Sequence, residues 1–262
     1  MLLLLQGSST IAQNGFNRFY TNDASSSVYR GIVAHGKGWM IAARVQDSST
    51  GKIGIRTIRM NQDGLIDTSS FFVLPDYPSR DADPVTKGIC TIDNNHYVVY
   101  GVVGTTTAAQ YSFLLMVDSN GKTIRYRDYK KEHCADIDSF FYNSELKYDG
   151  QGHLIMAGHT ICFTYTIPGD SKLLISKFDT SFNLLWSKVY TAGNQYRLGF
   201  SIAIANDGYV LAGGSKDESG DAQFRDAILI KTDTAGVLKW SYTTPKSKPF
   251  GYSTSVICTK DG

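Results

Sequence analysis

The chain has 262 residues, of which 42% are hydrophobic and 12% aromatic, so it is long enough to bury a substantial core. Its net charge is +2, and its lysines and arginines are scattered along the sequence. This argues against a nucleic-acid-binding surface, which needs a clustered basic patch. The 25 glycines and only 6 prolines fit a turn-rich β protein rather than a disordered tract.

The amino-terminal residues resemble the end of a secretory signal peptide. Residues 2–5 are all leucine, and Thr10 and Ala12 are small residues at the −3 and −1 positions of a cleavage before Gln13. A frayed apolar terminus is the alternative, since no Lys or Arg precedes Arg18. We predict that residues 1–12 are the remnant of a signal peptide with a clipped or misplaced start, and that the protein is secreted or at the cell surface. No later segment is apolar enough for long enough to span a bilayer.

After a lead-in at residues 13–26, one pattern repeats along the chain. Each copy has a polar turn, an apolar run, a loop, a second apolar run, an Asp or Asn turn and a further strand, most clearly in residues 206–244. The turn residues Asn61, Asp118, Asp179 and Asp233 recur at intervals of 57, 61 and 54 positions. Such a period indicates an array of one supersecondary unit. The copies are predicted at residues 27–80, 81–138, 139–196 and 197–250, with a partial copy at 251–262.

The apolar runs have the character of strands. They are short, rich in Val, Ile, Leu, Tyr and Phe, and bounded by Gly, Asp and Asn. Residues 228–230 are apolar on both faces, and such a strand needs a sheet that is covered on both sides. We therefore predict an all-β fold, a β-propeller of four-stranded antiparallel blades. A two-sheet sandwich is the alternative, but it gives no reason for the period.

Two features of the repeat predict local structure. Asp233 and Gly236 are expected to close the hairpin between the third and fourth strands, because Asp bonds its own backbone and Gly accepts a positive φ. In the third copy Asn183 stands where that glycine is expected. Trp186 and Trp240 each follow the turn aspartate by seven residues and are expected to wedge between neighbouring blades.

Residues 251–262 read as the first strand of a fifth unit. We predict an incomplete ring of four blades plus this strand, in a chain that is the amino-terminal part of a longer protein carrying the remaining blades. The alternative is a four-bladed ring in which residues 251–262 complete the first blade, although four is the lower limit for propellers.

The four cysteines are widely spaced and form no CxxC motif, which argues against a zinc site. Cys90 and Cys258 lie in matching tripeptides of different copies and are predicted to be buried thiols that do not pair. Cys134 lies in a connector and Cys162 at the end of a second strand, so the up-and-down strand order places both on one face. A disulfide between them is predicted, with two free thiols as the open alternative.

No motif of a known catalytic or cofactor site is present. His96 and His153 occupy equivalent positions just ahead of a second strand, which favours a structural role over catalysis or metal binding. The acidic loop at residues 217–221 has oxygen ligands around a glycine but lacks the spacing of a calcium-binding EF-hand, so we interpret it as a solvated loop. We predict no catalytic residue, no metal, no cofactor and no enzymatic activity.

The longer, irregular loops join the second strand to the third and one blade to the next, and all are expected on one face. Variable loops on a rigid scaffold are where binding normally occurs, although they can also be tolerated insertions. The candidate binding residues in them are Tyr77, Phe163, Tyr165, Tyr196, Arg197, Asp217, Asp221 and Arg225.

The segments at residues 207–214 and 226–241 resemble the repeats of secreted bacterial propeller proteins. The resemblance covers residues 27–262 and implies export by the type IX route and an extracellular location. The segment from the turn aspartate to the tryptophan is also similar to blades of quinoprotein dehydrogenases. We predict a non-enzymatic binding or adhesion scaffold for a protein or glycan ligand. A fragment of a quinoprotein-like oxidoreductase and a structural spacer without ligand are the alternatives.

Overall fold

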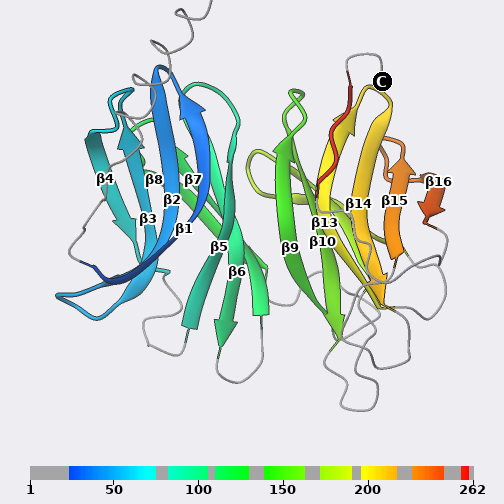
Figure 1. Ribbon diagram of the computed structural model, residues 1–262, viewed down its shortest axis with the longest axis horizontal. Coiled ribbons are helices and arrows are strands. Elements are labelled where there is room, and N and C mark those ends of the chain that lie inside the picture. The colour runs from blue at the N-terminus through cyan, green and yellow to red at the C-terminus, as the bar shows by residue number, and fades with distance from the viewer. Residues whose placement is uncertain are drawn as a thin grey trace, which may run out of the picture.

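The structure is a computed structural model of the 262-residue chain, and it describes residues 24–74, 82–105, 110–129, 139–162, 172–190, 196–216, 226–244 and 255–259. These residues form four four-stranded antiparallel sheets (Figure 1), and no helix occurs among them. In each sheet the strands are ordered as they occur in the chain, so every neighbouring pair is a hairpin. The predicted all-β fold of four-stranded antiparallel blades is confirmed.

The first two blades use the first half of the chain. Blade 1 contains β1 (Ala24–His35), β2 (Gly38–Asp47), β3 (Ile53–Met60) and β4 (Ile66–Phe72). Blade 2 contains β5 (Ala82–Thr91), β6 (His96–Thr105), β7 (Gln110–Asp118) and β8 (Thr123–Tyr129).

The other two blades repeat this arrangement. Blade 3 contains β9 (Ser139–Tyr148), β10 (His153–Cys162), β11 (Leu173–Asp179) and β12 (Leu184–Tyr190). Blade 4 contains β13 (Tyr196–Ala205), β14 (Gly208–Lys216), β15 (Asp226–Thr232) and β16 (Leu238–Thr243). The first strands are the inner ones: β1 contacts β5, β5 contacts β9, and β9 contacts β13.

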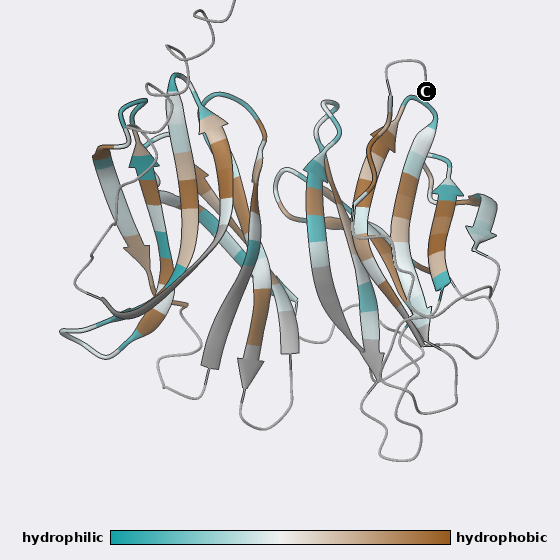
Figure 2. Ribbon diagram, viewed as in Figure 1, coloured by the Kyte–Doolittle hydropathy of each residue, from teal (hydrophilic) through white to brown (hydrophobic). Residues whose placement is uncertain are grey.

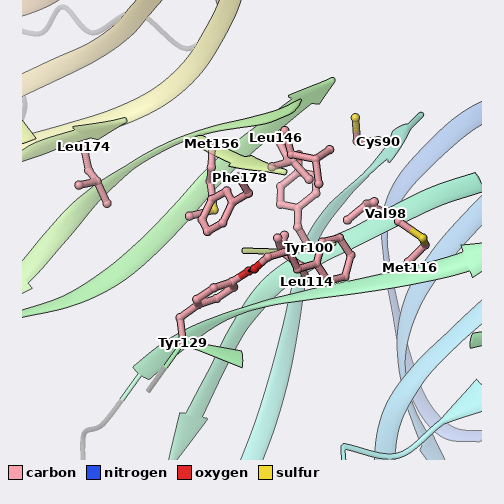
Figure 3. Packing of buried hydrophobic residues seen from close by; sticks show 12 residues of the cluster. Cys90, Val98, Tyr100, Leu114, Met116, Tyr129, Leu146, Met156, Leu174 and Phe178 are labelled. Carbon is pink, nitrogen blue, oxygen red and sulfur yellow. The ribbon is translucent and has the colours of Figure 1, made fainter. Parts of the chain in front are cut away.

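Each pair of successive blades encloses its own hydrophobic core, and Figure 2 shows the apolar residues running along the strands. Met40 of blade 1 packs with Val99 of blade 2, whereas the adjacent Val98 packs with Leu154 of blade 3 (Figure 3 shows this second core). Ile155, next to Leu154, belongs to the third core, between blades 3 and 4. Alternate side chains therefore enter different cores, which explains the strands that are apolar on both faces. Sheets stacked in this way are the blades of a β-propeller.

The hairpins between third and fourth strands follow the predicted chemistry. Asp233 accepts hydrogen bonds from the backbone N–H groups of Ala235 (3.0 Å) and Val237 (2.8 Å), and Gly236 has a φ of +74°. In blade 3, however, the residue with positive φ is Phe182 (+69°) rather than Asn183. The prediction for Asn183 was wrong by one position: its backbone and its side-chain amide both donate to Asp179 instead. The Phe182 side chain is completely buried, and this packing stabilises a conformation that a bulky residue normally avoids.

The outer strand of one blade holds the hairpin of the next. The Trp186 ring lies so close to Gly236 that a Cβ there would be 2.8 Å from the ring, and its centroid is 6.1 Å from that of Tyr209. The Tyr190 hydroxyl donates to the carbonyl of Gly236 at 2.8 Å. Trp186 thus wedges between blades 3 and 4 as predicted, whereas Trp240 on β16 is 47% exposed.

The four blades form an open arc. Within the described part of the chain, contacts between inner strands run from β1 to β13 but none of comparable extent joins β13 back to β1. Residues 255–259, red in Figure 1, lie beside β13, and the backbone N–H of Val256 donates to the hydroxyl of Ser201 at 3.1 Å. This is the place of the first strand of a fifth blade.

Candidate functional site

All four inner strands carry a β-bulge at the same position. The register of each strand against its second strand shifts by one residue, which leaves an extra residue on the inner strand. The extra residues are Arg30, Lys87, Ser144 and Phe200. A bulge bends its strand and changes the direction of the next side chain. The sequence provided no signal for this feature, because the four residues have nothing in common.

In β9 and β13 the residues that follow the bulges, Glu145 and Ser201, join the two inner strands. Oε2 of Glu145 on β9 accepts hydrogen bonds from the hydroxyl of Ser201 (2.6 Å) and from the backbone N–H of Ile202 (2.7 Å), both on β13. Its other oxygen lies 2.8 Å from Nζ of Lys147. Ser201 in turn accepts the N–H of Val256. A continuous chain of hydrogen bonds thus links β9, β13 and residues 255–259, where unpaired edge N–H groups would otherwise lack acceptors. We call Glu145, Ser201 and Val256 the inner clasp.

Three titratable side chains near the inner clasp are held uncharged. Burial raises the pKa of the Cys90 thiol to about 11. Burial, with the nearby Glu145 carboxylate, also raises the pKa of Tyr100 well above its usual range. On β10, burial and the charge of Lys87 lower the pKa of His159 to about 3.

These protonation states bear on what the cluster can do chemically. A thiol with so high a pKa is a poor nucleophile, and an imidazole with so low a pKa is a weak base near neutral pH. The Ser201 hydroxyl already donates to Glu145 and accepts from Val256. The geometry suits a fixed connection between strands, and the sequence reading did not find it because its members lie in different copies of the repeat.

His96 and His153 begin β6 and β10, at the opposite end of the blades from the irregular loops. Nδ1 of His96 lies 2.9 Å from the carboxylate of Asp93, and Nδ1 of His153 lies 2.8 Å from that of Asp149. The hydrogen bond from His96 lowers the pKa of Asp93. Both histidines therefore stabilise the turn between a first and a second strand, which agrees with the structural role predicted for them.

Most of the predicted binding residues lie outside the described residues. These are Tyr77, Phe163, Tyr165, Asp217, Asp221 and Arg225. Tyr196 and Arg197 are the first two residues of β13, where their backbones pair with Lys216 and Ser215 of β14. They therefore start an inner strand rather than lying within a loop, at the end of blade 4 from which residues 217–225 leave β14.

The structure describes three of the four cysteines. Cys90 is a buried free thiol, as predicted, whereas the prediction of burial was wrong for Cys258, which is a free thiol that is partly exposed. Cys162 is the last residue of β10, as the sequence indicated, whereas Cys134 lies outside the described residues. The predicted disulfide between Cys134 and Cys162 stays a prediction.

The antiparallel order assigns the connections to two ends of the blades. The turns that join a first strand to a second strand, such as residues 36–37 and 206–207, lie at one end of the blades. The connections that join a second strand to a third strand leave the other end; they are residues 48–52, 106–109, 163–172 and 217–225. The described loop at the second end is tightly ordered by Asp47, which accepts hydrogen bonds from the backbone of Ser49 (2.9 Å) and Thr50 (2.8 Å). The hydrogen bond from the Ser49 hydroxyl, with those from Thr50, lowers the pKa of Asp47 to about 2.

Within the described residues no group of three or more His, Cys, Asp or Glu side chains is arranged to hold a metal ion. The same residues contain no helix with the length and hydrophobicity needed to cross a membrane.

Comparison with known proteins assigns no activity to the chain. No family model matches the chain, and no curated protein matches it. A protein of unknown function from Bacteroides caccae aligns over 91% of this chain and 74% of its own, with a TM-score of 0.51 and 10% identity. Likeness at this level concerns the fold alone.

Two further structures align with lower TM-scores. The apocarotenoid oxygenase from Synechocystis has a TM-score of 0.47 at 9% identity, and the alignment covers 84% of this chain and 50% of that one. The β-propeller domain of the trilobed protease from Pyrococcus furiosus has a TM-score of 0.44 at 11% identity, with 87% of this chain and 59% of that one covered. The chain thus spans between half and three fifths of these two proteins.

Proposed function

We propose that the chain is a non-enzymatic, extracellular or cell-surface propeller that binds a protein or a glycan at the end of its blades where the irregular loops emerge. The observation that carries the proposal is the difference between the two ends. At one end the turns are short and held by Asp–His and Asp–backbone hydrogen bonds. At the other, connections such as residues 163–172 and 217–225 differ in length and composition from blade to blade.

The chemistry of those connections suits recognition of a polar surface. Residues 163–172 include Phe163 and Tyr165, and residues 217–225 include Asp217, Asp221 and Arg225. Aromatic side chains provide rigid contact area with a polar edge, and charged residues provide orientation. A rigid four-blade scaffold beneath them reduces the entropy that binding would otherwise cost.

The proposed location follows from the sequence. The apolar and small residues before Gln13 resemble a signal peptide, and the repeats resemble those of secreted bacterial propellers exported by the type IX route. A test is mass spectrometry of the culture medium, the surface fraction and the cell lysate of the native host. A protein that starts near Gln13 and occurs outside the cell supports the location, whereas one retained in the lysate contradicts it.

The binding role is tested with variants at the two ends. Labelled wild-type protein is applied to host cells, to extracellular-matrix proteins and to a glycan array. We expect Tyr165→Ala combined with Arg197→Ala to reduce binding at least tenfold, a loss of about 1.4 kcal/mol. Lys37→Ala, at the short-turn end, should leave it unchanged. Equal binding by all three proteins would mean that the irregular-loop end is not the binding surface, and no binding to any of these targets would favour a structural spacer.

The quinoprotein alternative is tested directly. The protein is mixed with a quinone cofactor and Ca²⁺, and absorbance and dye reduction are recorded in the presence of alcohols and sugars. We expect no change in either signal. Substrate-dependent dye reduction would replace the binding proposal with an oxidoreductase.

A further inference from the structure

One face of blade 4 differs from the same face of every other blade. It is the face turned away from blade 3, and its members are Val210, Leu229, Trp240 and Tyr242; we call it the outer face of blade 4. Trp240 is 47% and Tyr242 53% exposed, and Val210 and Leu229 are partly exposed. Such a group of large apolar side chains in contact with water needs an explanation.

The equivalent positions in the other blades are covered by the next blade. Val98 and Ile155, which match Val210, are fully buried, and so are Leu114 and Ile175, which match Leu229. Each lies in the core shared with the blade that follows. The outer face of blade 4 thus has the composition of an inter-blade core without the sheet that would complete it.

The contacts of Trp186 show what Trp240 lacks. Trp186 packs on a hairpin residue with positive φ and no side chain, Gly236, and beside Tyr209 at the start of the second strand of the next blade. Trp240 occupies the same place on β16, seven residues after its turn aspartate. Its partner should therefore be a hairpin of the same kind, next to a strand that begins with an aromatic residue.

Residues 255–259 already lie where the inner strand of such a sheet belongs. The N–H of Val256 reaches Ser201 across the gap beside β13, just as the hydroxyl of Ser201 reaches Glu145 across the gap beside β9. Ile257 follows Val256 as Ile202 follows Ser201, yet Ile257 is 81% exposed whereas Ile202 is buried. Residues 255–259 thus lie beside β13 without the further strands that would cover the side chain of Ile257.

From these contacts we infer that the outer face of blade 4 is the seat of a fifth blade, formed by the same polypeptide as it continues from Thr259. The fifth blade carries a small residue at its third hairpin turn, against Trp240, and an aromatic residue at the start of its second strand. A second copy of the chain fits the face less well, because its own β1 would have to lie where residues 255–259 lie beside β13.

The first test measures the exposure of Trp240 in two proteins, the 262-residue chain and the product of the complete reading frame, by hydroxyl-radical footprinting. In the 262-residue chain Trp240 should be modified several-fold faster than Trp186, and in the complete product the two should react alike. Unchanged reactivity of Trp240, or a reading frame that supplies no further strands, would overturn the inference. The inference would also be overturned if Trp240 became more protected as the concentration of the 262-residue chain rises and the chain sedimented as a dimer. The outer face of blade 4 would then be covered by a second copy of the chain.

The second test uses a matched pair of substitutions and does not depend on labelling. In the complete product, Trp240→Ala should lower the melting temperature by about 6 to 10 °C, as expected for removal of a buried tryptophan from a protein of this size. In the 262-residue chain the same substitution should have a much smaller effect. Trp186→Ala should lower the melting temperature equally in both proteins, because blade 4 covers Trp186 in each. Equal effects of Trp240→Ala in the two proteins would contradict the inference.

Discussion

The inner clasp makes a quantitative prediction about how blades 3 and 4 are held together. Glu145→Ala removes the acceptor of two donors, the Ser201 hydroxyl and the Ile202 N–H, and both residues are almost completely buried. A hydrogen bond to a charged group contributes about 1.5 to 3 kcal/mol, and a buried donor without an acceptor costs about 1 to 3 kcal/mol. The Glu145 side chain is 23% exposed, so water can reach part of the space that it leaves. We therefore expect a loss of about 2 to 4 kcal/mol in the free energy of unfolding.

Three companion variants separate the contributions. Glu145→Gln keeps one acceptor oxygen and should cost about half as much as Glu145→Ala. Lys147→Ala removes only a partly exposed ion pair and should cost at most about 1 kcal/mol. Ser201→Ala combined with Glu145→Ala should cost less than the sum of the two single changes, with a coupling of about 1 to 2 kcal/mol, because the two side chains share a hydrogen bond.

Urea denaturation measures the global effect, and amide hydrogen exchange measures the local one. If the clasp opens about 2 kcal/mol more easily, exchange of the Ile202 amide should be about 30-fold faster, provided that it exchanges by local opening. Additive effects in the double-mutant cycle, or an unchanged Ile202 amide in Glu145→Ala, would refute the role that we give to the carboxylate.

Three further predictions concern single side chains. His159 has a pKa of about 3 in the folded protein and an ordinary pKa of 6.5 in the unfolded chain, so only the unfolded state takes up a proton as the pH falls below 6.5. The protein should therefore be about 2 kcal/mol less stable at pH 5 than at pH 7.5. In urea titrations, His159→Gln should remove most of that difference. Iodoacetamide at pH 8, followed by peptide mapping, should label Cys258 in the folded protein and leave Cys90 unmodified until urea is added. The reason is that Cys90 is buried and has a pKa of about 11. Rapid labelling of Cys90 would contradict the structure. Tyr190→Phe removes the hydrogen bond to the Gly236 carbonyl and should lower the free energy of unfolding by about 0.5 to 1.5 kcal/mol, and no change would mean that water replaces the hydroxyl.

The residue with positive φ in the hairpin between β11 and β12 shows where prediction from the conformational preference of single residues fails. Asparagine tolerates positive φ better than most residues, so Asn183 was the reasonable choice. The structure instead places Phe182 there, where its side chain fills the core between blades 2 and 3 and its carbonyl accepts the Tyr129 hydroxyl at 2.9 Å. Packing with residues far away in the chain outweighed a local preference of about 1 to 2 kcal/mol.

The candidate binding residues show a different limit. Their selection from the sequence rested on where irregular loops leave a regular scaffold, and the strand order that this requires is confirmed. Tyr196 and Arg197 nevertheless belong to β13, because the strand extends two residues before Leu198 and pairs with the end of β14. Strand ends depend on the pairing partner, which a single segment does not reveal.

The sequence by itself determined the strands, their hairpins and the period of the repeat, because those depend on contacts between residues a few positions apart. A continuous run of apolar side chains specifies a strand covered on both faces, and an aspartate followed by a residue with positive φ specifies the turn. Only the tertiary structure decided which side chains join one blade to the next. Glu145 and Ile202 are 57 positions apart and meet because two bulged inner strands lie side by side. The exposure of Trp240 was equally beyond the sequence, because Trp186, in the same local pattern, is covered by a neighbouring sheet.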